Sequence, residues 1–110
     1  MADVMSQIKS LIDQNKVVIF MKGTPALPMC GFSAATVEVL NELGVPYKGV
    51  NVLEDPELRE GIKVYSKWPT IPQVYVNGEF IGGCDIVREM YATGELREML
   101  STRGIETQAA

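Results

Sequence analysis

The sequence predicts an α/β fold in which a four-stranded mixed sheet is flanked by helices, with the elements in the order αβαβαββαα. Three observations predict it. The chain has 110 residues, of which 46% are hydrophobic and 22% charged, and this suits one globular domain. Short apolar runs alternate with stretches of helical periodicity. The pair Asn77-Gly78 lies between two short apolar runs and is a strong signal for a β-hairpin.

The first half of the chain predicts a helix followed by a strand–helix–strand unit. The first helix is indicated by apolar residues at i, i+4, i+7 and i+8: Val4, Ile8, Leu11 and Ile12. The continuous apolar run Val17–Met21 is rich in β-branched residues and predicts a strand buried on both faces. A second helix is expected from about residue 33 to 43, ended by Gly44, and a second strand over 47–53. Such a crossover favours parallel strands with a right-handed connection.

The second half predicts a helix, a hairpin and two further helices. Asp55 as N-cap and Pro56 at the first helical position open a helix whose apolar positions are Leu58, Ile62 and Tyr65. Residues 73–76 and 79–81 form the hairpin strands. The last helices are marked by apolar residues on either side of a glycine: Ile86, Val87, Met90 and Tyr91, then Gly94, Leu96 and Leu100. Residues 104–110 lack apolar periodicity, so we expect a single domain with a core over about residues 5–100 and a loose tail.

The composition excludes several classes of function. The sequence has no histidine, which removes Ser-His-Asp and Cys-His catalysis and His-ligated metal sites. Two cysteines, Cys30 and Cys84, cannot provide the four ligands of a structural zinc within one chain. Ten Lys and Arg against fourteen Asp and Glu give a net charge of −4, which argues against a nucleic-acid partner. We find no signal peptide and no apolar run long enough for a membrane span, and expect a cytoplasmic protein with reduced thiols.

Cys30 is the main candidate for chemistry. It lies between the first predicted strand and the second predicted helix, where unpaired backbone N–H groups and the helix dipole favour a thiolate. Residues 14–37 contain no Asp or Glu but include Lys16 and Lys22, which act in the same direction. The alternative is that Cys30 is simply a small buried hydrophobic residue, as most free cysteines are.

Ser33 occupies the fourth position of the four-residue motif that begins at Cys30. A Cys-x-x-Cys dithiol attacks a disulfide and then resolves the mixed disulfide internally, but a hydroxyl cannot do so. If Cys30 is redox active, its partner thiol must come from Cys84, from a second protein molecule or from a small thiol in solution.

Four sequence motifs, in matching order, resemble those of the CGFS-type monothiol glutaredoxins: MKGTP at 21–25, CGFS at 30–33, WPTIP at 68–72 and GGCD at 82–85. The match covers roughly residues 5–100. The resemblance implies a thioredoxin-like fold, glutathione binding and a [2Fe–2S] cluster that bridges a homodimer.

The resemblance also assigns roles to individual residues. The cysteine matching Cys30 ligates iron, and the glutathione of each subunit adds a thiolate, so two subunits together provide the four sulfur ligands. Lys22 and Arg59 match the cations that hold the glycyl carboxylate of glutathione. Otherwise, both would be ordinary solvated surface cations.

The remaining glutathione contacts implied by the family lie in the second half of the chain. Ile71 and the cis proline Pro72 match the loop whose main chain pairs with the cysteinyl part of glutathione. Gly83 would allow close approach of the ligand. Cys84 and Asp85 would open a helix that binds the γ-glutamyl carboxylate, with Asp85 pairing with the ammonium group. Asp85 could also simply cap that helix.

Two aromatic residues complete the candidate site. Phe32 and Trp68 would either shield the cluster or the tripeptide, or belong to the core. Both alternatives stay open at this point.

Two functions from different classes follow. The first is a carrier whose homodimer holds the cluster for delivery to apo iron–sulfur proteins, with a BolA-like protein as a possible family partner. The second is a glutathione-dependent thiol–disulfide oxidoreductase that acts on mixed disulfides through Cys30. In the family, a proline-containing loop such as residues 24–28 accompanies cluster binding and weak oxidoreductase activity, so we favour the carrier.

Overall fold

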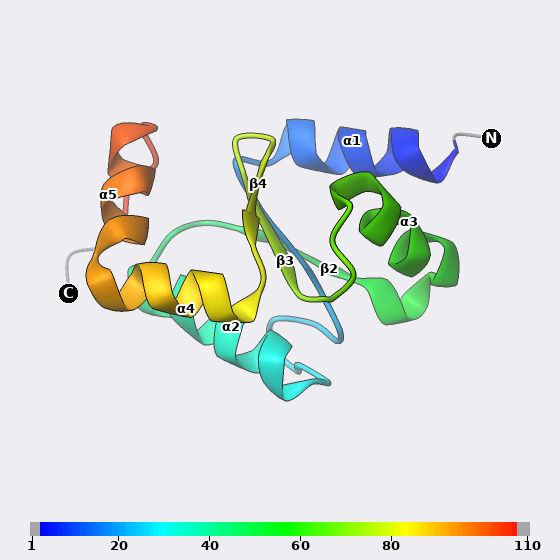
Figure 1. Cartoon of the computed structure of the whole chain (residues 1–110), viewed down its shortest axis with the longest axis horizontal. Helices are drawn as coiled ribbons and strands as arrows, with labels where there is room; N and C mark the ends of the chain where they lie inside the picture. Colours follow the sequence, from blue (N-terminus) through cyan, green and yellow to red (C-terminus); the bar gives the residue numbers. More distant parts are fainter. Residues whose placement is uncertain (1–2, 108–110) are drawn as a thin grey trace.

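A four-stranded mixed sheet with strand order β2-β1-β3-β4 lies between two layers of helices (Figure 1). The computed structural model describes residues 3–107. The elements are α1 (Val4–Gln14), β1 (Val17–Met21), α2 (Gly31–Leu43), β2 (Lys48–Asn51), the 3-10 helix η1 (Val52–Glu54), α3 (Pro56–Ser66), β3 (Gln73–Val76), β4 (Glu79–Gly82), α4 (Cys84–Thr93) and α5 (Glu95–Thr102). The expected order of helices and strands is confirmed.

The central strand β1 organises the sheet. It pairs in parallel with β2 and antiparallel with β3, which in turn pairs antiparallel with β4. All five residues of β1 are buried, as its continuous apolar run predicts. The carboxyl end of β1 therefore leads directly from the core to the segment that carries Cys30.

The core consists of two clusters, one on each face of the sheet, because successive side chains of a strand point to opposite faces. Val18 and Phe20 of β1 face α1 and α3, where they form a cluster with Ile8, Ile12, Leu58 and Ile62 of the helices and Tyr75 of β3. The alternate residues of β1 face the other helices, where the cluster includes Val37, Leu40, Val87, Leu96 and Leu100. Figure 1 shows α1 with α3 on one side of the strands and α2 with α4 on the other.

Three local boundaries depend on side-chain or backbone geometry. The helix α2 begins at Gly31, two residues before the expected start, because Cys30 is its N-cap. The strand β2 ends at Asn51, where the side-chain oxygen of Asn51 accepts a hydrogen bond from the N–H of Leu53 and the chain turns into η1. The hairpin is confirmed, with φ of 49° at Asn77 and 82° at Gly78, as a type I′ turn requires.

The prediction of a loose tail is wrong for residues 104–107. Gly104, at φ of 76°, reverses the chain after α5, and the N–H of Ile105 donates to the carbonyl of Leu100 at 2.9 Å. Ile105 is only 5% exposed and joins the core cluster. The sequence hides this because a single apolar residue after a helix stop has no periodicity. Residues 108–110, the rest of the predicted tail, lie outside the described residues.

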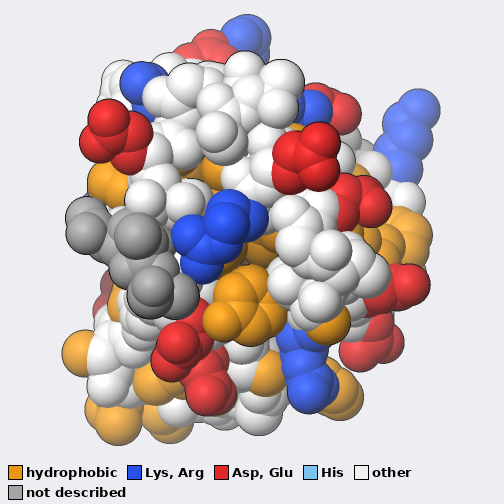
Figure 2. Space-filling model, turned by 90° about the vertical axis from the view of Figure 1, so that its left-hand side faces the viewer, with side chains coloured by type: hydrophobic (Ala, Val, Ile, Leu, Met, Phe, Trp, Pro, Cys, Tyr) orange, Lys and Arg blue, Asp and Glu red, His pale blue; other side chains and the backbone are white. Residues whose placement is uncertain are grey.

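The surface carries mixed charge. On the face shown in Figure 2, basic, acidic and hydrophobic side chains alternate. In the described part of the chain, no helix is both long and apolar enough to cross a membrane.

Candidate functional site

Cys30 lies where the loop after β1 meets the first turn of α2. It is the N-cap of the helix, with extended backbone angles, and its side chain is half-buried. Cys84, by contrast, is buried in the first turn of α4. Both cysteines are free thiols in the structure. The reading of Cys30 as a small buried hydrophobic residue therefore does not fit its position.

The surroundings of Cys30 hold the pKa of its thiol below the ordinary value. The largest cause is a hydrogen bond from the backbone N–H of Ser33. The N–H of Phe32, the positive charge of Lys22 and the hydroxyl of Ser33 act in the same direction, whereas burial opposes them. This agrees with the expectation from the helix N-terminus: the site favours the thiolate over the neutral thiol.

The loop between β1 and Cys30 has its own hydrogen bonds. The N–H of Met29 donates to the carbonyl of Lys22 at 2.9 Å. Between these two residues, the N–H of Thr24 donates to the carbonyl of Leu27 at 3.2 Å, and the N–H of Leu27 donates to the carbonyl of Thr24 at 3.0 Å. The loop is therefore a closed turn of defined shape.

Two residues of β2 fasten this loop to the edge of the sheet. The side-chain oxygen of Asn51 accepts a 2.9 Å hydrogen bond from the N–H of Gly23. Two positions earlier in the strand, Gly49 leaves room for the ring of Pro25, whose Cγ would lie 2.5 Å from a Cβ at that glycine. Residues two apart in a strand share a face, so Gly49 and Asn51 together form a seat for the loop.

A groove of about 200 Å³ lies beside this thiol-bearing segment. It is formed by the start of α2, the segment before β3 and the start of α4. Its lining residues are Phe32, Trp68, Thr70, Ile71, Pro72, Gly83, Cys84, Asp85 and Ile86. The bond between Ile71 and Pro72 is cis, as the resemblance implies. Below, we call this depression the groove.

The structure brings seven of the sequence-predicted residues together in the groove: Phe32, Trp68, Ile71, Pro72, Gly83, Cys84 and Asp85. Lys22, Cys30 and Arg59 are not among its lining residues. Lys22 follows β1 and acts on the Cys30 thiol through its charge. Arg59 is half-buried in the first half of α3, and its predicted role stays a prediction.

Sequence reasoning missed two lining residues. Thr70 belongs to the WPTIP motif, which implies no role for its side chain. The sequence predicts Ile86 only as an apolar helix position, yet it is 37% exposed and lines the groove. Its place in the first turn of α4, beside Asp85, is the signal that could have found it.

The structure excludes two of the alternatives that the sequence leaves open. Phe32 is 64% exposed and Trp68 38% exposed, so neither belongs to the core. Trp68 packs its ring against Phe80, at a centroid distance of 5.8 Å. The interpretation of Asp85 as a plain N-cap is wrong, because the N-cap of α4 is Gly83.

Gly83 is needed for packing within the chain. A Cβ at this position would lie 3.2 Å from the carbonyl oxygen of Pro72. The glycine thus allows the start of α4 to approach the segment before β3, which brings two walls of the groove together.

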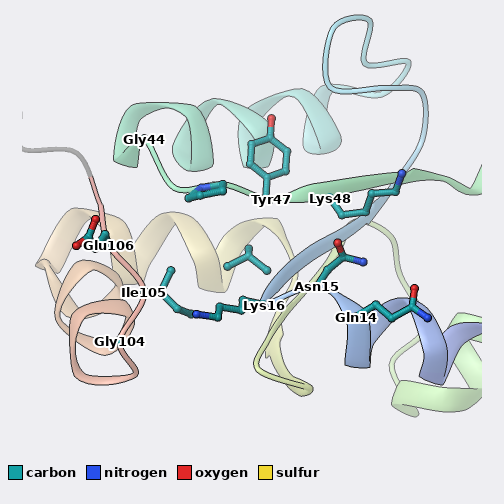
Figure 3. Close-up of a pocket in the computed structure, with 11 residues that line it drawn as sticks. Gln14, Asn15, Lys16, Gly44, Tyr47, Lys48, Gly104, Ile105 and Glu106 are labelled. Carbon is teal, nitrogen blue, oxygen red and sulfur yellow. The ribbon is translucent and has the colours of Figure 1, made fainter.

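A larger hollow, of about 610 Å³, lies at the opposite end of β1. Figure 3 shows that its residues come from the end of α1, the segment leading into β2 and the chain after α5. It is lined by charges of both signs, from Lys16, Lys48 and Glu106, and by no cysteine. Of these two hollows, the groove is the one that adjoins the Cys30 segment.

Comparison with known proteins decides the family. The glutaredoxin family model matches residues 17–81, which include Cys30 and five of the nine residues that line the groove. The chain belongs to the glutaredoxin family. The resemblance inferred from the four motifs is confirmed.

Individual relatives agree with this assignment. An uncharacterised monothiol glutaredoxin of Synechocystis is 59% identical over 95 residues, covering 86% of this chain and 89% of the relative. The mitochondrial monothiol glutaredoxin-5 of Saccharomyces cerevisiae is 54% identical over 101 residues, covering 89% and 67%. The solution structure of a monomeric truncated mutant of Trypanosoma brucei 1-C-Grx1 superposes with a TM-score of 0.89 at 41% identity, covering both chains fully. The fold is thus the thioredoxin-like fold of the glutaredoxins.

Proposed function

We propose that this glutaredoxin binds glutathione in the groove and, as a homodimer, carries a [2Fe–2S] cluster that it passes to apo iron–sulfur proteins. The cluster is cargo in this proposal. The observation that supports it most is the contrast between an accessible thiol at position 30 and a buried hydroxyl at position 33. Cys30 offers an accessible thiol with a lowered pKa, whereas Ser33 is 0% exposed and has no thiol to resolve a disulfide.

The donor set fits such a cluster. Thiolates are the usual ligands of [2Fe–2S] centres, and four are required. One Cys30 thiolate and one glutathione thiolate from each of two subunits make four. Exposed apolar side chains next to the thiol, from Leu27, Met29 and Phe32, supply a surface that a second subunit can cover.

The groove suits a small anionic peptide. Glutathione has two carboxylates and one ammonium group. The free N–H groups at the start of α4 can receive one carboxylate, and the carboxylate of Asp85 can pair with the ammonium. Lys22 and Arg59 are the cations proposed for the other carboxylate. Ile71, beside the cis Pro72, is proposed to pair through its main chain with the cysteinyl part.

Anaerobic reconstitution tests the proposal. Incubation of the apoprotein with iron, sulfide and glutathione should give a brown dimer, and native mass spectrometry should find two subunits, a cluster and two glutathione molecules. The Cys30→Ser variant should stay colourless, because it loses the protein ligand. Omission of glutathione should have the same effect.

Cys84→Ser is the matched control. It changes a thiol that lines the groove but is not needed for the ligand count, so most of the iron should remain. Loss of most iron from this variant would show that the assignment of ligands is wrong.

The lowered pKa of the Cys30 thiol also favours a second function, because thiolates attack disulfides. A glutathione-dependent reduction of mixed disulfides would use the same groove. A colourless monomer that rapidly reduces a glutathionylated substrate would place this activity first and the carrier function second.

A further inference from the structure

Gln73 is a polar residue whose side chain is fully buried, at 0% exposure, directly after the segment that forms one wall of the groove. It is the first residue of β3 and follows directly on Pro72, a lining residue. Buried amides are costly unless their hydrogen bonds are made, so this side chain needs partners within the protein. None of the roles described above uses it.

The amide of Gln73 makes three hydrogen bonds. Its Nε2 donates to the carbonyl oxygens of Trp68 and Thr70, at 3.2 and 3.1 Å. Its Oε1 accepts from the hydroxyl of Tyr75 at 3.2 Å. The orientation of the amide is determined by these partners, because the two carbonyls can only accept. Both donor hydrogens are thus used by the segment that forms one wall of the groove.

Trp68 is held from other directions as well. Its backbone N–H donates to Ser66 Oγ at 3.1 Å and to the carbonyl of Lys63 at 3.2 Å. Its ring rests on Phe80. Gln73 binds the carbonyl of Trp68. The backbone N–H, the ring and the carbonyl of this first residue of the wall are therefore all held in place.

The second hydrogen bond of the Gln73 amide holds Thr70, nearer the other end of the wall. Thr70 is exposed and lines the groove, and its carbonyl is bound by the same amide that binds Trp68. One buried side chain therefore fixes two main-chain carbonyls that flank Pro69 and precede Ile71. These two hydrogen bonds therefore also position the main chain of Ile71, which is proposed to pair with glutathione.

We infer that Gln73 is a positioning residue for the tripeptide: its buried amide brackets Trp68 and Thr70 and so sets the wall against which glutathione binds. The inference rests on the proposed function, which places glutathione in the groove. Gln73 itself does not touch the groove. It acts only through the two carbonyls.

The test compares glutathione affinity among variants of the apoprotein, measured by titration with reduced glutathione. Gln73→Glu keeps the size of the side chain and the oxygen that faces Tyr75, but replaces the donating amide with an acceptor. Gln73→Met removes all three hydrogen bonds without adding charge. We expect both variants to bind glutathione about fivefold or more weakly, the equivalent of roughly one hydrogen bond.

Tyr75→Phe separates positioning from stability. It removes only the third hydrogen bond and leaves both bonds to the wall, so glutathione affinity should stay near that of wild type although the protein is less stable. If affinity instead falls in all variants in proportion to their stability, the role of Gln73 is merely structural and the inference is overturned.

The pH profile of Gln73→Glu gives a second readout. On lowering the pH from about 8 to about 5, a buried carboxyl regains its proton and can again donate to one of the two carbonyls. Its affinity deficit relative to wild type should therefore shrink, whereas that of Gln73→Met should not. Identical profiles for the two variants would contradict the inference.

Measurements on the wild-type protein complete the test and need no variant to fold. The side-chain amide protons of Gln73 should exchange slowly with solvent, and rapid exchange would show that the bracket is absent. If wild type binds no glutathione, the proposed function fails and this role with it. If wild type binds and the Gln73 variants bind equally well, only the inference about Gln73 fails.

Discussion

The backbone N–H of Lys22 donates a 3.1 Å hydrogen bond to the hydroxyl oxygen of Ser33, whose side chain is fully buried. This contact joins the end of β1 to the first turn of α2. Serine thus occupies the position at which a dithiol protein has its resolving cysteine, and here it has a structural role. The same hydroxyl also helps to lower the pKa of the Cys30 thiol.

Ser33→Ala should therefore lower stability and raise the pKa of the Cys30 thiol. The N–H of Lys22 loses its acceptor in a partly buried place, which costs about 1–3 kcal/mol. Urea unfolding measures this loss. Ser10→Ala is a suitable control, because Ser10 makes an exposed hydrogen bond within α1, and its effect should stay within about 0.5 kcal/mol. Equal stabilities for the two variants would show that the hydrogen bond between Lys22 and Ser33 does not stabilise the fold.

Lys22→Gln should raise the pKa of the Cys30 thiol, because the positive charge of Lys22 lowers it. At neutral pH a smaller fraction of the thiol is then ionised, so alkylation slows, and the rates converge at high pH. We expect a loss of about two- to fivefold at neutral pH, since solvent screens exposed charges. Alkylation by iodoacetamide from about pH 5 to 10, in a Cys84→Ser background, measures the profile. Lys16→Gln, at the other end of β1, should leave it unchanged.

Most of the fold follows from patterns that are local in the sequence. The apolar run at 17–21, the turn Asn77-Gly78 and the helix opening Asp55-Pro56 each specify their own geometry, and all three are confirmed. Boundaries that depend on a side chain far away were not predictable in this way. The end of β2 at Asn51 is one, because the same amide oxygen also binds Gly23, 28 residues earlier.

The candidate site was predictable to a similar extent. Seven of the named residues meet in the groove because they flank turns and helix starts that motifs reveal. The support beneath them was not predictable, since Gln73 looks like an ordinary strand residue until its amide is found under Trp68. Which residues hold a loop in place depends on tertiary contacts, and the sequence alone does not contain those distances.

Asn51→Ala should free the loop that precedes Cys30. The N–H of Gly23 loses its acceptor, and its hydrogen exchange should accelerate about fivefold or more, which corresponds to one hydrogen bond. Exchange measured by NMR on the apoprotein checks this. Asn15→Ala removes a comparable amide bond, to the carbonyl of Leu11 at the other end of β1, and should not alter Gly23. Unchanged exchange at Gly23 in Asn51→Ala would show that Asn51 of β2 does not hold the loop.

Gly49→Ala tests the same seat by overpacking. The new Cβ would lie 2.5 Å from Pro25 Cγ and 2.7 Å from its Cδ, so the proline must move. We expect a loss of about 1–3 kcal/mol in the free energy of unfolding. In the double variant with Pro25→Ala the clash disappears, so the two effects should not add. Strict additivity would mean that the two residues do not touch.

Ile105→Ala should destabilise the protein by about 2–5 kcal/mol, because it leaves a cavity in the cluster formed with α2, α4 and α5. A loose tail would instead tolerate the change. Val64→Ala offers a comparison of similar chemistry, since Val64 is 67% exposed, and should change stability by no more than about 0.5 kcal/mol. Urea unfolding of both variants decides between a docked and a loose segment at residues 104–107.

Tyr75 should make the protein sensitive to alkali. Burial raises the pKa of its hydroxyl to about 12, against about 10 for an exposed tyrosine. The folded state thus keeps a proton that the unfolded chain releases, so this stabilising contribution is complete below about pH 10 and is lost as the pH rises to about 12. Urea unfolding over this range should show a steeper decline for wild type than for Tyr75→Phe. Tyr91→Phe, at an exposed position of α4, should retain the wild-type decline, and a parallel decline in all three proteins would disprove the assignment to Tyr75.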